Sequence, residues 1–206
     1  MKGFLTLTKL AAKSVIKQFA NKYNLVYFGA VSARSDEHQL VRGVTAASTH
    51  TDNNYTVGTY NGHDLILVER RNVISHPKLP TTKHHWLILQ IDLKQKDLPH
   101  IFIDSHHDQT FHSNLSIGHS KLRDITSLVP NLGHSRILAP VEHIEDVHKI
   151  ITNDFIAAMH SFQHFDYEIN DDQLFVYAHN PLITTVLLTD MLRIGAWLAD
   201  YLDKVN

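Results

Sequence analysis

The chain has 206 residues, 43% of them hydrophobic, and its 19 basic and 21 acidic residues give a formal charge of −2. This composition supports one folded core and argues against a domain that its overall charge draws to nucleic acid. The absence of cysteine excludes disulfides, thiolate nucleophiles and cysteine-bound zinc. Histidine is frequent, with 17 copies, so mild acid should change the surface charge strongly.

The first predicted element is an amphipathic helix over residues 5–23. Its apolar residues recur at helical spacing, and five lysines without any acidic residue precede Asn24. Residues 1–24 therefore form a basic helix that either packs on the domain or lies peripherally on an anionic membrane surface or an acidic partner. Packing on the domain is favoured, because basic solvent faces are common on such helices.

No signal peptide or transmembrane segment is predicted. Lysines interrupt the N-terminal region, and three charged residues interrupt the apolar stretch 182–202. The protein is therefore expected to be soluble and cytoplasmic.

After the first helix the hydrophobic period changes toward two. Strands are predicted over residues 25–31 and 40–48, separated by a charged connection. A hairpin follows, in which Asn61-Gly62 supplies the two positive-φ positions of a type I′ turn between residues 55–60 and 63–70. Residues 71–83 contain two prolines and little periodicity, which predicts a long loop.

The stretch between residues 84 and 108 combines apolar segments with histidines and aspartates at their ends. It predicts two strands, 86–93 and 100–104, joined by a polar turn and paired with each other, so that His84 lies opposite Asp108. Alternation along these strands separates two faces. The better core face carries His85, Leu87, Leu89, Ile91, Leu93, Ile101 and Ile103.

The second half of the chain is predicted to be mainly helical. The expected elements are a strand over 111–118, a short helix capped by Ser120, an extended piece over 136–139, a helix over 142–162, a hairpin of 165–169 with 174–177, and a last helix from 180 to about 204. Together these elements predict a single α+β domain over residues 1–206. A largely antiparallel, curved sheet of about 7–9 strands is packed by N-terminal, middle and long C-terminal helices.

A metal site is one hypothesis for the end of the second central strand. If the strand continues, Asp104, His106 and Asp108 project from one face, and the expected pairing brings His84 nearby. Two carboxylates and two imidazoles suit Zn²⁺, Mn²⁺ or Fe²⁺, and an open position on the metal would activate water for hydrolysis. The same residue types are also expected where a strand emerges into solvent, so this metal-dependent hydrolase is the secondary interpretation.

Other catalytic and nucleic-acid motifs are absent from the sequence. It has no G-x-S-x-G elbow, no G-x-G-x-x-G loop and no Walker A loop, and its His-Ser pairs lack the second hydroxyl of a phosphoesterase motif. A modest basic patch of Arg70, Arg71, Lys78 and Lys83 lacks interleaved aromatic residues and is interpreted as solvated charge.

The favoured function is a non-enzymatic binding or interaction module with a histidine-rich surface. Its partner is an unknown protein or small molecule, and no cofactor is expected beyond the candidate divalent metal. The candidate binding residues lie beside the long loop and are His84, His85, Trp86, His106 and His107.

Several blocks of sequence also carry a resemblance. The chain resembles uncharacterised proteins of Saccharibacteria in the blocks GTYNGHDLILVERR, WLILQIDL, LPHIFID, FQHFDYEINDDQLFVYAHNP and WLADYL. The resemblance covers nearly the whole chain. It implies a bacterial origin and no known activity, and it assigns no functional residue.

Overall fold

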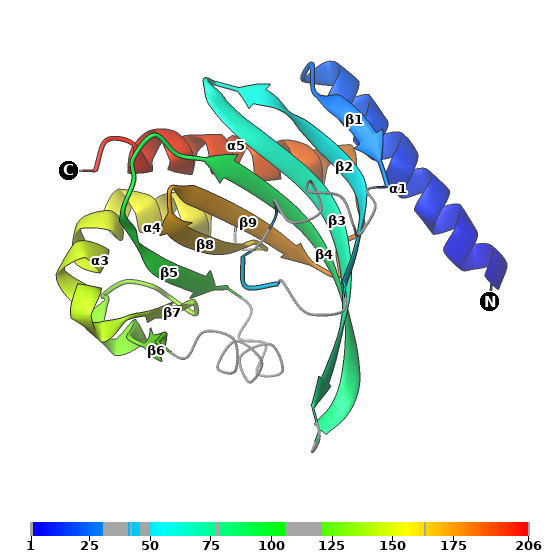
Figure 1. Ribbon diagram of the computed structural model, residues 1–206. Helices are drawn as coiled ribbons and strands as arrows, with labels where there is room; N and C mark the ends of the chain where they lie inside the picture. Colours follow the sequence, from blue (N-terminus) through cyan, green and yellow to red (C-terminus); the bar gives the residue numbers. More distant parts are fainter. Residues whose placement is uncertain are drawn as a thin grey trace.

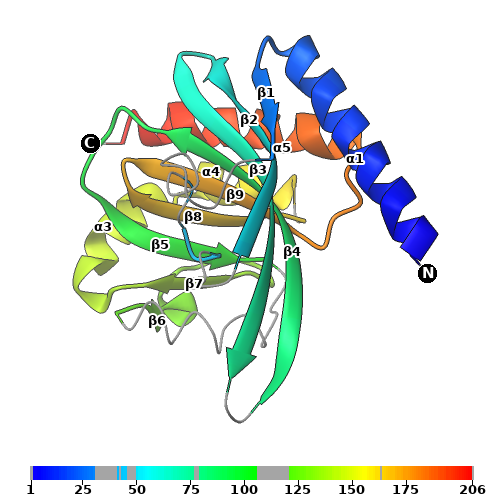
Figure 2. The same cartoon turned by 45° about the vertical axis from the view of Figure 1, so that its right-hand side comes forward.

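The structure is a computed structural model that describes residues 2–30, 41, 43–45, 50–76, 79–105, 121–162 and 164–205. In this part of the chain a nine-stranded antiparallel sheet has the strand order β1-β2-β3-β4-β9-β8-β5-β7-β6. The sheet is curved, and the helices lie on one side of it (Figures 1 and 2). The predicted α+β class with an antiparallel curved sheet is confirmed.

The strands are β1 (Val26–Gly29), β2 (His50–Tyr60), β3 (His63–His76), β4 (Leu79–Asp92), β5 (Leu98–Asp104), β6 (Arg123–Asp124), β7 (Arg136–Ala139), β8 (Asp166–Asp171) and β9 (Gln173–His179). The α-helices are α1 (Lys2–Lys22), α3 (Ile144–Ile150), α4 (Asn153–His160) and α5 (Thr185–Leu202). The described residues also form the single-turn 3₁₀ helices η2 (Thr126–Leu128) and η3 (Val141–His143).

The larger core lies between the sheet and the helices. It includes Ile16 and Phe19 of α1, residues of α3 and α4, and the long buried side of α5. Helix α5 approaches β4 closely at Gly195, where a Cβ atom would lie 2.8 Å from Ile91 Cδ1. The first helix therefore packs on the domain through its apolar side, as the favoured interpretation of residues 1–24 requires.

The smaller core lies on the other face of the sheet and contains buried charges. The Arg70 guanidinium donates from Nε and Nη2 to the two carboxylate oxygens of Asp52, at 2.8 and 2.7 Å, and both side chains are fully buried. Arg70 Nη2 also donates to the Val41 carbonyl oxygen at 2.7 Å. Glu168, likewise buried, accepts the Val44 N–H at 2.8 Å. These two charged side chains hold residues 41 and 44 against the sheet.

Several sequence predictions are confirmed. The Asn61-Gly62 turn joins β2 to β3, and both residues have positive φ, 51° and 81°. The second hairpin pairs β8 with β9. The alternation of the central strands also holds, because Leu87, Leu89, Ile91, Leu93, Ile101 and Ile103 all belong to the larger core.

The predicted loop over residues 71–83 is wrong. Strands β3 and β4 continue through most of it as one long antiparallel ladder, in which Arg71 lies opposite His85 and Val73 opposite Lys83. Pro80 is accommodated because β4 pairs with β9 only from Trp86 onward, and a proline without an N–H is tolerated where a strand has an open edge. In Figure 1 this hairpin extends well beyond the rest of the sheet.

The predicted pairing of residues 86–93 with 100–104 is also wrong. Strand β4 pairs with β9, whereas β5 pairs with β8 and β7. The residues between β4 and β5, 93–97, form a connection in which Asp203 Oδ1 accepts the Lys94 and Gln95 N–H groups at 2.8 and 3.0 Å. Two strands therefore separate β4 from β5.

The helical predictions need smaller corrections. The predicted helix 142–162 is interrupted at Ile151, and Thr152 begins α4 as an N-cap that accepts the Phe155 N–H at 3.4 Å. The last helix begins at Thr185 rather than at 180. The short helix after Ser120 is replaced by β6 and η2. The strand over 111–118 lies outside the described residues, as does most of 40–48, whose described residues 41 and 43–45 are not part of a strand.

Candidate functional site

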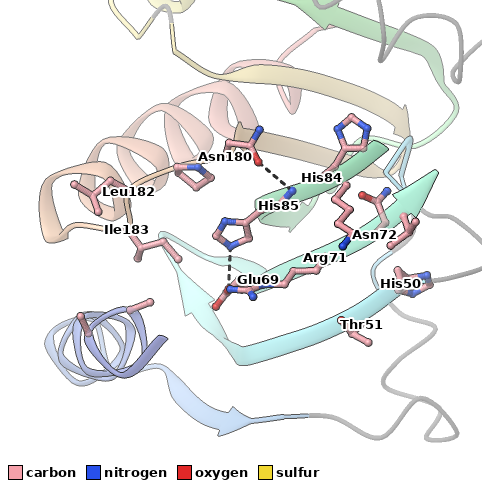
Figure 3. Close-up of a pocket in the computed structure, with 15 residues that line it drawn as sticks. His50, Thr51, Glu69, Arg71, Asn72, His84, His85, Asn180, Leu182 and Ile183 are labelled. Atoms are coloured by element: carbon pink, nitrogen blue, oxygen red, sulfur yellow. Dashed lines mark hydrogen bonds and ion pairs between the residues drawn. The ribbon is translucent and has the colours of Figure 1, made fainter. Parts of the chain in front are cut away.

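A pocket of about 730 Å³ lies between the β3–β4 hairpin, the start of β2, α1 and the segment that leads into α5 (Figure 3). Its volume falls within the usual range for small-molecule sites, about 300–1,000 Å³. One side of the pocket is polar and comes from the sheet. The other side is apolar and comes from α1 and residues 181–183.

The polar side is built by strand alternation. Glu69, Arg71 and Val73 project from one face of β3, and their partners in the ladder place Lys83 and His85 on the same face of β4. Figure 3 shows His85 directed across the hairpin toward Glu69. Further along the same face the side chains are apolar and join the larger core. The pocket therefore begins where the core face of this hairpin becomes polar.

Glu69 is the centre of the polar side. Its Oε1 accepts from Arg71 Nη2 at 2.8 Å and from His85 Nε2 at 2.9 Å, and its Oε2 accepts from Asn54 Nδ2 at 2.5 Å. The Asn54 Oδ1 atom in turn accepts the Tyr27 hydroxyl at 2.6 Å. A β-bulge between Asn53 and Thr56 gives Asn54 a positive φ of 54°. This chain of hydrogen bonds leaves Arg71 and His85 fixed at the pocket surface.

The surroundings of Glu69 determine its charge. Burial alone would raise its pKa, but hydrogen bonds from His85 and Arg71, together with their positive charges, lower the pKa from 4.5 to about 2. Burial and the Glu69 charge raise the pKa of Tyr27. Glu69 is therefore an ionised anchor for its cationic neighbours.

The first prediction concerns Glu69→Gln. Because folding lowers the Glu69 pKa, the ionised carboxylate stabilises the fold above about pH 4.5, and this contribution is lost as the pH falls toward about 2. Near neutral pH the substitution is expected to lower the free energy of unfolding by about 2–3 kcal/mol. Urea unfolding at a series of pH values measures the difference, which should shrink between these two pH values. A difference independent of pH would contradict the role of the charge.

The apolar side of the pocket comes from two separate parts of the chain. Its residues are Ala11, Ala12, Pro181, Leu182 and Ile183. Ile183 is buried, whereas the Leu182 side chain is 81% exposed and stands at the rim. The small alanine side chains of α1 leave space that a larger residue at the same positions would fill.

His84 and Trp86, two of the candidate binding residues, project from the other face of β4. His84 Nδ1 lies 3.1 Å from His179 Nε2, and His84 Nε2 lies 2.9 Å from the Thr82 hydroxyl. Trp86 is buried in the smaller core and stacks on His179 with ring centroids 4.2 Å apart. His84 still reaches the pocket edge, whereas Trp86 does not line it. Of the histidine pair, His85 is the one directed toward Glu69.

The remaining predicted site residues are not brought together by the described structure. Asp104 is buried at the end of β5, and the wrong strand pairing removes the reason to place His84 beside it. His106, His107 and Asp108 lie outside the described residues. Among the residues that are described, no group of three or more histidine and acidic side chains is arranged to hold a metal ion. The metal hypothesis for Asp104, His106 and Asp108 therefore stays a prediction.

No protein-family model and no curated protein matches this chain. Its fold is similar to the crystal structure of the mycobacterial trehalose monomycolate transport factor A, TtfA. The two structures align with a TM-score of 0.64 over 93% of this chain and 94% of that chain, with 11% sequence identity. The two chains share a fold. At this identity the likeness carries no residue role from TtfA to this chain.

The sequence interpretation missed most of the pocket. The sequence does not single out Glu69 or Asn180, and it places Arg71 and Lys83 in a basic patch with Arg70, which is buried in the structure. Continuing the period-two pattern of β3 past Arg70 would have placed Glu69, Arg71 and Val73 on one face. No sequence signal joins these residues to α1 or to Leu182.

Proposed function

We propose that this chain is a non-catalytic binding module that holds a small amphiphile with an anionic head in the pocket beside Glu69. The observation that carries the proposal is the division of one pocket into a cationic side and an apolar side. Such a division matches a molecule that has a charged head and a hydrocarbon chain.

The charges around the pocket favour an anionic head. Two basic side chains, Arg71 and Lys83, line it together with His50, His84 and His85. In the described part of the chain Glu69 is the single acidic residue of the lining, and both its oxygens already accept hydrogen bonds. Hydrogen-bond donors of the pocket lining therefore exceed acceptors, and such a lining suits a carboxylate or phosphate group.

The apolar side favours a hydrocarbon chain. Leu182 is exposed at the rim, and covering its side chain with a ligand would remove apolar surface from water. Ala11 and Ala12 continue this surface along α1. TtfA is described as a transport factor for trehalose monomycolate, which is an amphiphile. That description supports the general chemical class, while the head group is argued from the residues of the pocket.

The second prediction is a binding measurement. Dodecanoate, kept below its micelle concentration, is expected to bind the full chain saturably in isothermal titration calorimetry. Arg71→Gln should weaken this binding about 10-fold, because it removes a charge-assisted contact of about 1.5–3 kcal/mol. Arg123→Gln is the matched control, since Arg123 is exposed on β6 and away from the pocket lining, and it should leave binding unchanged.

Three further ligands and one variant test the charge of the head group, the need for a hydrocarbon chain and the place of binding. Dodecyl phosphate should bind, whereas dodecyl trimethylammonium and acetate should not, because one has a cationic head and the other lacks a chain. Ala11→Trp, on the exposed side of α1, should block the pocket. Equal binding of the cationic and anionic amphiphiles would overturn the proposed head group, and no saturable binding would overturn the module itself.

The metal-dependent hydrolase is tested separately. Elemental analysis of the chain purified without a histidine tag measures bound zinc, manganese and iron. A stoichiometric metal would support the site at Asp104, His106 and Asp108, and its absence would remove that alternative.

A further inference from the structure

We propose that α1 and the segment leading into α5 form a docking surface for an anionic bilayer, placed at the rim of the pocket. We call this the α1–Leu182 surface; it consists of Lys13, Lys17, Lys22, Leu182 and Val186. It extends the proposed function by giving an amphiphile a route between a membrane and the pocket. Docking itself does not require an occupied pocket.

The distribution of charge supports a membrane surface. The first 23 residues contain five lysines and no acidic residue, whereas the whole chain has a formal charge of −2, so the remainder is net acidic. Lys13, Lys17 and Lys22 are exposed along α1, and the helix buries its apolar side through Ile16 and Phe19. These three lysines thus lie on the solvent side of one helix. A bilayer that contains anionic lipid attracts such a side.

Two exposed aliphatic side chains lie on the segment that leads into α5 and on the first turn of that helix. Leu182 and Val186 are 81% and 69% exposed, and Val186 lies in the first turn of α5. Helices α1 and α5 pack on the same face of the sheet, so their solvent sides both face away from it (Figures 1 and 2). Ala11 of α1 and Leu182 line one pocket, which places the apolar part of the surface beside the helix that carries the lysines.

A bilayer fits this combination better than a protein partner does. Lysine is depleted in protein–protein interfaces, and two exposed aliphatic side chains do not make the buried core that a stable interface has. A fluid bilayer needs no matching shape. It accepts a few inserted aliphatic side chains while lysines remain among the head groups.

The experiment is vesicle co-sedimentation of the full chain. Binding is expected to mixed phosphatidylcholine and phosphatidylglycerol vesicles, to fall as salt rises, and to be absent with phosphatidylcholine alone. The triple variant K13Q/K17Q/K22Q should weaken partitioning roughly 100-fold, since each lysine near an anionic surface contributes about fivefold. The matched control, K96Q/K121Q/K204Q, removes three lysines that are exposed elsewhere and should bind like the wild type.

The apolar part has its own pair of variants. L182S/V186S should weaken vesicle binding about 10-fold. L128S/V141S replaces two other exposed aliphatic residues and should change nothing. Circular dichroism confirms that each variant is folded.

The outcomes separate this inference from the proposed function. R71Q alters the pocket and should keep vesicle binding, so docking can hold even if dodecanoate does not bind. Unchanged vesicle binding by K13Q/K17Q/K22Q overturns the α1–Leu182 surface. An equal loss in the K96Q/K121Q/K204Q control also overturns it, because attraction would then depend only on overall charge.

Discussion

Asp52→Ala is expected to lower the free energy of unfolding by about 3–5 kcal/mol. Asp52 and Arg70 form a fully buried, two-point ion pair. Removing the carboxylate leaves a guanidinium charge in the smaller core, where water cannot replace the lost oxygens. Urea unfolding followed by circular dichroism measures the change.

Two further variants test whether the unpaired charge of Arg70 causes the loss of stability. Asp52→Leu combined with Arg70→Met removes both charges and should recover much of the lost stability, since apolar replacements of a buried pair are often neutral. Asp146→Ala breaks an exposed ion pair to Lys149 and should leave the unfolding midpoint unchanged. If Asp52→Ala resembled Asp146→Ala, the pair would not be buried as described.

Trp86→Ala is expected to cost about 3–5 kcal/mol of stability. Trp86 is 1% exposed, stacks on His179, contacts the Tyr177 ring edge-on, and donates from Nε1 to Asn72 Oδ1 at 3.3 Å. Its removal leaves a large cavity in the smaller core. The sequence interpretation placed this residue in a binding site, whereas these contacts give it a packing role.

The other tryptophan provides the control. Trp197 is 41% exposed on α5 and stacks on Tyr201 with ring centroids 5.4 Å apart. Trp197→Ala should therefore cost about 1 kcal/mol or less. Chemical unfolding measured by far-ultraviolet circular dichroism compares the two without relying on tryptophan fluorescence. A small effect at Trp86 would contradict its burial and restore it as a candidate for ligand contact.

Local patterns in the sequence predicted much of the fold. Asn61-Gly62 determines its turn through backbone conformation alone, and alternation determines which face of β4 is buried. Alternation does not determine the neighbouring strand. A face rich in leucine and isoleucine packs equally well whether β4 lies beside β5 or beside β9, which is why the predicted pairing was wrong.

The helix predictions illustrate a related limit. The apolar residues of α3 and α4 continue one helical period across Ile151 and Thr152, so the sequence suggested one helix. The break becomes visible only where Thr152 caps α4. Prediction of the candidate site from the sequence has the same limit. His85 was predicted, but Glu69 and Leu182 join it through tertiary packing that no local pattern encodes.

In the long β3–β4 hairpin, the two halves of β4 are hydrogen-bonded to different numbers of strands. From Trp86 to Asp92, β4 is bonded on both edges, so its amide groups open only when the sheet itself opens. From residue 79 to 84, β4 has a ladder only to β3 among the described residues, and its opening is a local event. Lys83 and His85 lie where these two regions meet. One end of the pocket can therefore change shape by local opening of the hairpin, without opening of the sheet.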